Sequence, residues 1–96
     1  MQSIEKVYSQ IVEFSKKFGA EKVVLFGSRA RGDNQEKSDI DVAIYQCDRF
    51  EELKDTLDEE LWSLLQVDLI NMDDSYISEE LMKEIKKDDV ILYEKV

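Results

Sequence analysis

Four consecutive apolar residues, Val23 to Phe26, place the strongest constraint on the fold of this chain. The run is bounded by turn-forming residues and is short, which is typical of a strand that is buried on both faces. A sheet that contains such a strand must be covered by other elements, because each apolar face has to be buried. The rest of the chain therefore has to supply the covering helices.

The spacing of apolar residues predicts the helices that cover the sheet. Apolar residues recur at steps of three or four from Ile4 to Phe18, which predicts an amphipathic helix that Gly19 ends. The same spacing predicts a second helix over 49–64, with Asp48 as its N-cap. Ser78 can cap a last helix, with glutamates in its first turn and lysines late, an order that suits the helix dipole.

Three further strands are expected, at Asp39–Tyr45, Gln66–Asn71 and Val90–Tyr93. Because helices and strands alternate, we expect an α+β fold, a small mixed β-sheet flanked by helices. A chain of 96 residues leaves room for one domain, 1–96.

The composition excludes several kinds of chemistry. The chain has no histidine and one cysteine, so catalytic triads, Cys-His pairs and ordinary zinc sites are ruled out. A net charge of -10 argues against direct nucleic-acid binding, which depends on Lys and Arg neutralising phosphates. No apolar run approaches the ~20 residues of a membrane span. We therefore expect a cytoplasmic protein. Some apolar helix positions could be buried against a partner, so an oligomer is possible.

Acidic residues stand where strands should be apolar. In the segment from Asp39, alternation places Ile40, Val42 and Ile44 on one face and both Asp39 and Asp41 on the other. Paired carboxylates on a buried strand are costly unless a cation neutralises them.

Asp68 repeats this pattern in a later strand, between Val67 and Leu69. If the two strands are neighbours, their carboxylates converge. An oxygen-only ligand set suits Mg²⁺ or Mn²⁺ bound together with a triphosphate, and two ions would stabilise an in-line displacement at phosphorus.

Gly27 and Ser28 follow the first strand and precede a segment that could open a helix. Such a junction offers backbone N–H groups to a phosphate, and glycine lets the backbone approach closely. No Gly-Lys-Ser/Thr sequence is present, so a Walker-type phosphate loop is not implied.

Together these residues resemble a known family. The segment LFGSRARG, followed by SDIDVAI and a later strand aspartate, is similar to the signature of the DNA polymerase beta-like nucleotidyltransferases. Within that superfamily it resembles the minimal nucleotidyltransferases, the MNT antitoxins of HEPN/MNT modules. The likeness is close over residues 23 to 45 and looser as far as Asp68.

The resemblance implies roles for the residues that match it. Asp39 and Asp41 would bind both metal ions, while Asp68 would complete one metal site and help to deprotonate the acceptor. Gly27 and Ser28 would hold the phosphates of ATP, the expected substrate.

Two arginines and a serine flank these motif residues. Arg29 and Arg31 could neutralise the triphosphate, because a guanidinium suits bidentate phosphate contact. Ser38 could orient the first aspartate. For the two arginines, an ordinary solvated position is the alternative.

The resemblance also implies a reaction. Minimal nucleotidyltransferases of this kind transfer AMP to a tyrosine of a HEPN toxin, and we expect the same metal-dependent activity here. Two alternatives stay open: a non-catalytic antitoxin that masks its partner by contact, and a small-molecule nucleotidyltransferase of the aminoglycoside-modifying type. The nucleotide base, the acceptor and the choice between Mg²⁺ and Mn²⁺ are not encoded in any of these motifs.

Overall fold

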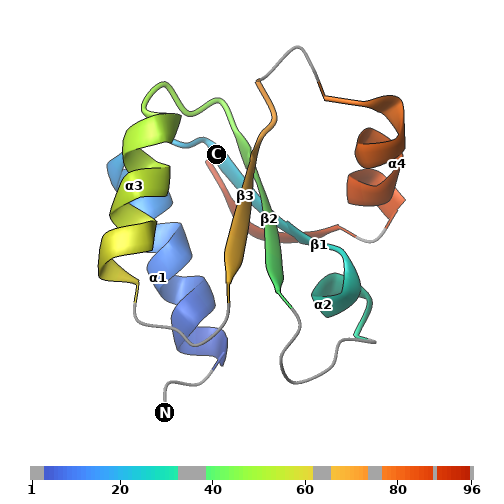
Figure 1. Ribbon diagram of the computed structural model, residues 1–96, viewed down its shortest axis with the longest axis horizontal. Coiled ribbons are helices and arrows are strands. Elements are labelled where there is room, and N and C mark those ends of the chain that lie inside the picture. Colours follow the sequence, from blue (N-terminus) through green and yellow to red (C-terminus); the bar gives the residue numbers. More distant parts are fainter. Residues whose placement is uncertain (1–3, 33–38, 62–65, 74–76, 88, 96) are drawn as a thin grey trace.

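A computed structural model describes residues 4–32, 39–61, 66–73, 77–87 and 89–95. Four helices alternate with four strands along these residues (Figure 1). Their order is α1 (Ile4–Lys17), β1 (Lys22–Phe26), α2 (Ser28–Arg31), β2 (Ile40–Tyr45), α3 (Phe50–Glu60), β3 (Val67–Asn71), α4 (Glu79–Lys87) and β4 (Val90–Glu94). Within these ranges, no helix is both long and apolar enough to cross a membrane.

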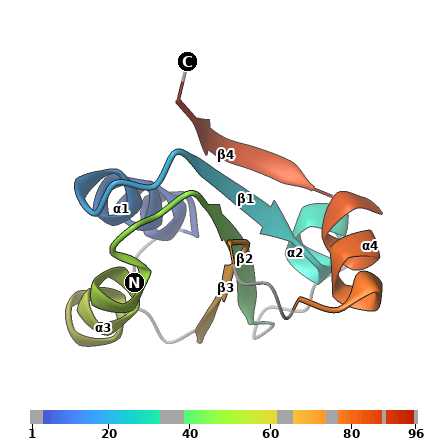
Figure 2. The same cartoon turned by 90° about the horizontal axis from the view of Figure 1, so that it is seen from above.

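The four strands form one mixed sheet in the order β3-β2-β1-β4. Strand β1 pairs antiparallel with both β2 and β4, whereas β2 and β3 run parallel. Helices α1 and α3 lie on one face of the sheet, and α2 and α4 lie on the other (Figure 2). The predicted fold, a small mixed sheet flanked by helices, is confirmed.

Each face of the sheet has its own apolar core. The larger core joins α1 and α3 to alternate residues of the central strands, and Ile40, Val42 and Ile44 are fully buried in it. The smaller core, on the opposite face, contains Val24, Phe26, Ala43 and Ile85. Strand β1 therefore contributes to both cores, as its continuous apolar run predicts.

Helix boundaries agree with the sequence at two ends and differ at two. Gly19, with φ of +91°, follows the end of α1, and the N–H of Leu81 donates to Oγ of Ser78 at 3.2 Å, so both predictions are confirmed. Helix α3, in contrast, ends at Glu60, where the prediction extended it to residue 64. Leu61 already has extended backbone, and residues 62–64 of the predicted helix lie outside the described residues.

The predicted N-cap of α3, Asp48, is also wrong. Arg49 occupies the cap position without a side-chain cap hydrogen bond, and its guanidinium pairs with Glu52 instead. The reason lies in the turn after β2, where Gln46 adopts a left-handed backbone with φ of +54°. This turn shifts the first helical residue by one position relative to the sequence-based expectation.

Asp73 fixes this turn from the far end of β3. Its carboxylate accepts hydrogen bonds from the backbone N–H groups of Gln46, at 3.0 Å, and Cys47, at 3.2 Å. The Asp73 backbone N–H donates in turn to Oδ1 of Asn71. These bonds connect the end of β2 to the end of β3, although Gln46 and Asp73 are 27 positions apart in the sequence.

Replacing Asp73 with alanine is expected to destabilise the fold by about 1–3 kcal/mol, because two backbone donors lose their acceptor and one is partly buried. Chemical denaturation measures this change. Asp55→Asn, at an exposed position of α3, is the matched control and should change stability by less than about 0.5 kcal/mol. Equal stability of the two variants would show that the Asp73 bonds do not hold the turn.

Candidate functional site

Three side chains lie in a row across neighbouring strands, on the sheet face opposite the larger core. Phe26 of β1 pairs in register with Asp41 of β2, and Asp41 pairs with Asp68 of β3. Residues directly opposite each other in a sheet project their side chains to the same face. The two aspartates that the sequence places on separate strands are therefore immediate neighbours, as the candidate metal site requires.

Gly27 brings the backbone against this pair. It follows β1 with φ of +77° and stands at the start of α2. A Cβ at this position would lie 2.7 Å from Oδ2 of Asp41. The positive φ and the close carboxylate both require glycine, because any side chain would collide with Asp41.

The environment of Asp41 disfavours its negative charge. Burial raises the pKa of this carboxyl group above its usual value, and the nearby charges of Asp68, Asp39 and Glu84 raise it further. Loss of hydration and repulsion between like charges both favour the protonated form. A bound cation would reverse both effects.

Asp39 stands just before β2 and is exposed. Its charge contributes to the raised pKa of Asp41. Across the described ranges, however, no three acidic, cysteine or histidine side chains form a compact metal-binding group. Like charges repel when no cation neutralises them, so a compact arrangement of all three carboxylates requires a bound cation.

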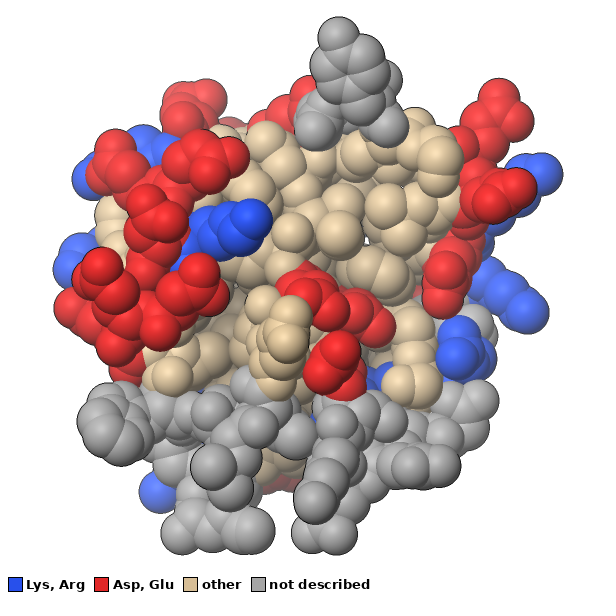
Figure 3. Space-filling model, in the orientation of Figure 1, with Lys and Arg blue, Asp and Glu red and all other residues tan. Residues whose placement is uncertain are grey.

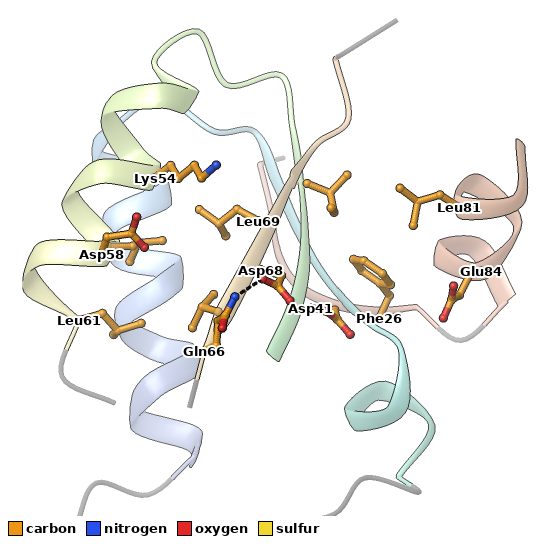
Figure 4. A pocket seen from close by; sticks show the side chains of 13 residues that line it. Phe26, Asp41, Lys54, Asp58, Leu61, Gln66, Asp68, Leu69, Leu81 and Glu84 are labelled. Atoms are coloured by element: carbon orange, nitrogen blue, oxygen red, sulfur yellow. Dashed lines mark hydrogen bonds between the residues drawn. The ribbon is translucent and has the colours of Figure 1, made fainter. Parts of the chain in front are cut away.

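Asp68 has a hydrogen-bond partner of its own. The Nε2 of Gln66, two residues earlier on the chain, donates to Oδ1 of Asp68 at 3.0 Å (Figure 4). This bond orients the Asp68 carboxylate. Asp68 lies on an edge strand, because β3 is the last strand in the sheet order. Sequence reasoning did not single out Gln66, because a lone glutamine before a strand has no distinguishing pattern.

The predicted phosphate-binding residues lie beside the aspartates. Ser28 is the first residue of α2, directly after the buried Gly27. Arg29 is half-buried and Arg31 is exposed on the same short helix. Ser38, expected to orient Asp39, lies outside the described residues. The roles of these side chains toward a nucleotide stay predictions.

A hollow of about 700 Å³ opens over the acidic pair and along β3. Asp41, Asp68 and Phe26 line it from the sheet, and side chains of α3 and α4 line it from the two sides (Figure 4). Figure 3 shows an acidic group near the middle of this face and a larger one over α3, with uncharged atoms between them. The hollow is large enough for a nucleotide or a peptide side chain.

Glu84 is a fourth carboxylate that the sequence did not reveal. It lies on α4, lines the same hollow and contributes to the raised pKa of Asp41. In the sequence it is one of several charged residues on a helix, and only the packing of Ile85 against the smaller core aims this helix at the site.

Asp41→Asn is expected to stabilise the metal-free protein at neutral pH. A carboxyl group whose pKa is raised by folding binds its proton more tightly in the folded state, so its ionised form lowers stability above that pKa. This loss of stability becomes smaller as the pH falls through the pKa of Asp41 in the folded protein toward its pKa in the unfolded chain, about 3.9. Each ~1 kcal/mol added to the free energy of unfolding corresponds to a rise in Tm of about 4–8 °C.

The check is denaturation of wild type and Asp41→Asn in chelator at pH 7.5 and pH 5. The stability gained by the variant should be larger at pH 7.5. A variant that is less stable than wild type at pH 7.5 would contradict the assigned electrostatics. Asp55→Asn again serves as the control, with no pH-dependent difference expected.

The fold and this acidic pair define a nucleotidyltransferase-type domain, and comparison with known families agrees. The family model described as "Polymerase beta, Nucleotidyltransferase" matches residues 9–96. The chain therefore belongs to the polymerase beta nucleotidyltransferase family, as the sequence resemblance implied. No curated protein matches the sequence.

Solved structures show the same fold. A toxin–antitoxin structure with AMP-PNP is similar with a TM-score of 0.71 and 23% identity, covering 92% of this chain and 73% of the other. A mutant of the toxin–antitoxin pair MntA–HpeT, with two aspartates replaced by glutamate, gives 0.70 and 21%, with the same coverage. A nucleotidyltransferase-like protein from Sulfolobus solfataricus gives 0.52 and 24%, covering 90% and 76%.

Proposed function

We propose that this protein transfers AMP from ATP to a hydroxyl group of a protein partner, and that the partner is a HEPN-type toxin which the transfer silences. The observation that carries the proposal is the register of Asp41 beside Asp68, with Asp39 near them and Gly27 against Asp41. Membership of the nucleotidyltransferase family supports the reaction type. Likeness to a toxin–antitoxin structure with AMP-PNP supports the nucleotide and the kind of partner.

The residues fit divalent cations. Asp39, Asp41 and Asp68 offer carboxylate oxygens only, which suits Mg²⁺ or Mn²⁺. Burial and the neighbouring carboxylates raise the pKa of Asp41, which supports a cation as the missing counter-charge. When bound, two such ions would neutralise the carboxylates and stabilise charge on the attacking and leaving oxygens.

The side chains then have distinct tasks. Gly27 keeps the backbone close to the carboxylates, and in the proposed reaction the N–H groups at the start of α2 and the hydroxyl of Ser28 hold the β- and γ-phosphates. Arg29 and Arg31 would add positive charge beside the triphosphate.

In the proposed reaction Asp68 accepts the proton of the acceptor hydroxyl. The hydroxyl oxygen forms a bond to the α-phosphorus as the bond from that phosphorus to the bridging oxygen breaks, and pyrophosphate leaves. Gln66 holds one oxygen of Asp68 by its hydrogen bond and so keeps the carboxylate turned toward the site.

The direct test combines the chain with Mg²⁺, ATP labelled at the α-phosphate and the purified product of the neighbouring gene. Label on a tyrosine of the partner, together with loss of its ribonuclease activity, is expected. Partner silencing without label would favour an antitoxin that acts by contact. Pyrophosphate release with a hydroxylated small molecule, and none with the partner, would favour the small-molecule enzyme.

A further inference from the structure

Strand β3 is an edge strand that runs through the middle of the hollow. In the sheet order it has β2 on one side and, among the described residues, no strand on the other. Figure 1 shows this open side facing the viewer, between α3 and α4. All five residues of β3 are half-buried, so the edge is sunk between the two helices and not raised above them.

The backbone of β3 presents hydrogen-bonding groups along this edge. The C=O of Gln66 accepts from Ile40, and the N–H of Met72 donates to Ile44, so both point toward β2. Because backbone groups alternate in direction along a strand, those of Val67, Leu69 and Asn71 point outward. An unpaired edge of this kind is a template for another strand.

The side chains around the edge define what such a strand would carry. Apolar side chains lie on both sides of β3, from the sheet and from the flanking helices: Leu57, Leu61, Leu69, Ile70 and Leu81. Among the described residues, the charged side chains lining the hollow are four carboxylates, Asp41, Asp58, Asp68 and Glu84, and one lysine, Lys54. An incoming segment should therefore combine apolar and basic side chains.

Helix α3 strengthens this charge preference. It has six acidic residues and a single basic one along its 11 residues. Figure 3 shows these carboxylates gathered beside the hollow. A large field of one sign attracts a segment of the opposite sign and speeds its encounter with the surface.

We propose that β3 receives an extended, basic segment of the acceptor protein as a fifth strand of the sheet. In an antiparallel pairing, Asp68 occupies a non-hydrogen-bonded position on the outer edge, where opposite Cα atoms lie about 4.5 Å apart and side chains are closest. The residue opposite Asp68 projects to the same face as this carboxylate. Its hydroxyl is thereby brought to the group that accepts its proton.

This inference rests on the proposed function only for the identity of the incoming hydroxyl. Strand addition itself needs neither nucleotide nor metal ion. It can therefore be tested by binding alone, so that failure of pairing and failure of transfer give separate results.

The test uses a synthetic peptide, acetyl-Lys-Val-Arg-Tyr-Val-Lys-Arg-amide, and amide hydrogen exchange of the full chain followed by NMR. Slower exchange is expected at Val67 and Leu69, whose N–H groups gain partners, with little change at Asp68 and Ile70, which point to β2. A peptide in which glutamate replaces every lysine and arginine should not bind. Binding of the basic peptide without protection at Val67 and Leu69, or no binding at millimolar concentration, would overturn the proposal.

Matched variants of α3 test the charge argument. Asp58 and its neighbour Glu59 are both exposed, but only Asp58 lines the hollow. Asp58→Lys should weaken peptide binding several-fold and reduce its salt dependence, while Glu59→Lys should have a smaller effect. Equal effects of the two reversals would show that the peptide does not lie in the hollow.

Discussion

Replacing Asp39 and Asp41 together with asparagine is expected to lower AMP transfer on the order of a thousandfold or more. The amide side chain has nearly the same shape but no charge, so it cannot neutralise divalent cations. Metal ions supply several kcal/mol of transition-state stabilisation, and each ~1.4 kcal/mol is worth a factor of ten in rate. The measurement is the rate of label transfer from ATP to the partner at saturating Mg²⁺.

Misfolding of the variant is the obvious alternative explanation for such a loss, and it is tested by measuring the stability of the variant. Because Asp41 carries a raised pKa in the folded protein, removing its charge should stabilise the metal-free chain. If the double variant is stable but inactive, the loss of activity comes from the missing carboxylates and not from unfolding. Asp55→Asn should retain full activity, since Asp55 is exposed on α3 and does not line the hollow.

The same variant separates transferase from masking antitoxin. If the double variant still silences the partner without transferring label, neutralisation occurs by contact. If transfer rates stay within tenfold of wild type, Asp39 and Asp41 are not metal ligands and the proposed function is wrong.

Gly27→Ala is expected to have the second largest effect. The new methyl group would lie 2.7 Å from Oδ2 of Asp41, so either the carboxylate or the backbone must move. An alanine at φ of +77° also strains the backbone, at a cost of order 1–3 kcal/mol. Because Asp41 is displaced from the site, we expect transfer to fall by about a hundredfold, since small displacements of reacting groups have effects of this size.

Gly19→Ala is the matched control for this substitution. Gly19 also has a positive φ, +91°, but a Cβ there would meet no atom within 4 Å. Both variants should lose comparable stability, while only Gly27→Ala should lose activity beyond what the stability change explains. Equal activity in the two variants would show that close contact between Gly27 and Asp41 does not matter for function.

Local patterns in the sequence predicted the elements and much of the site. Alternation in β2 separated Ile40, Val42 and Ile44 from Asp41, and the structure buries the three apolar residues while keeping Asp41 on the opposite face. The apolar run of β1 and the caps at Gly19 and Ser78 were equally readable, because each depends on neighbouring residues only.

What the sequence could not give depends on contacts between distant residues. The exit of β2 is set by Asp73, from beyond β3, so the start of α3 fell one residue later than its own sequence indicates. Glu84 joins the site only because Ile85 docks α4 on the smaller core. Pairing of Asp41 with Asp68 was conditional on strand order, which no local pattern encodes.

The proposed reaction requires that Asp39, Asp41 and Asp68 together bind divalent cations. The most direct measurement is a crystal structure of the chain with Mn²⁺ and a non-hydrolysable ATP analogue, with manganese located by anomalous scattering. We predict anomalous peaks within about 2.0–2.3 Å of carboxylate oxygens from all three aspartates, with the triphosphate beside Gly27 and Ser28. Manganese bound elsewhere, with Asp68 outside its coordination, would contradict the account.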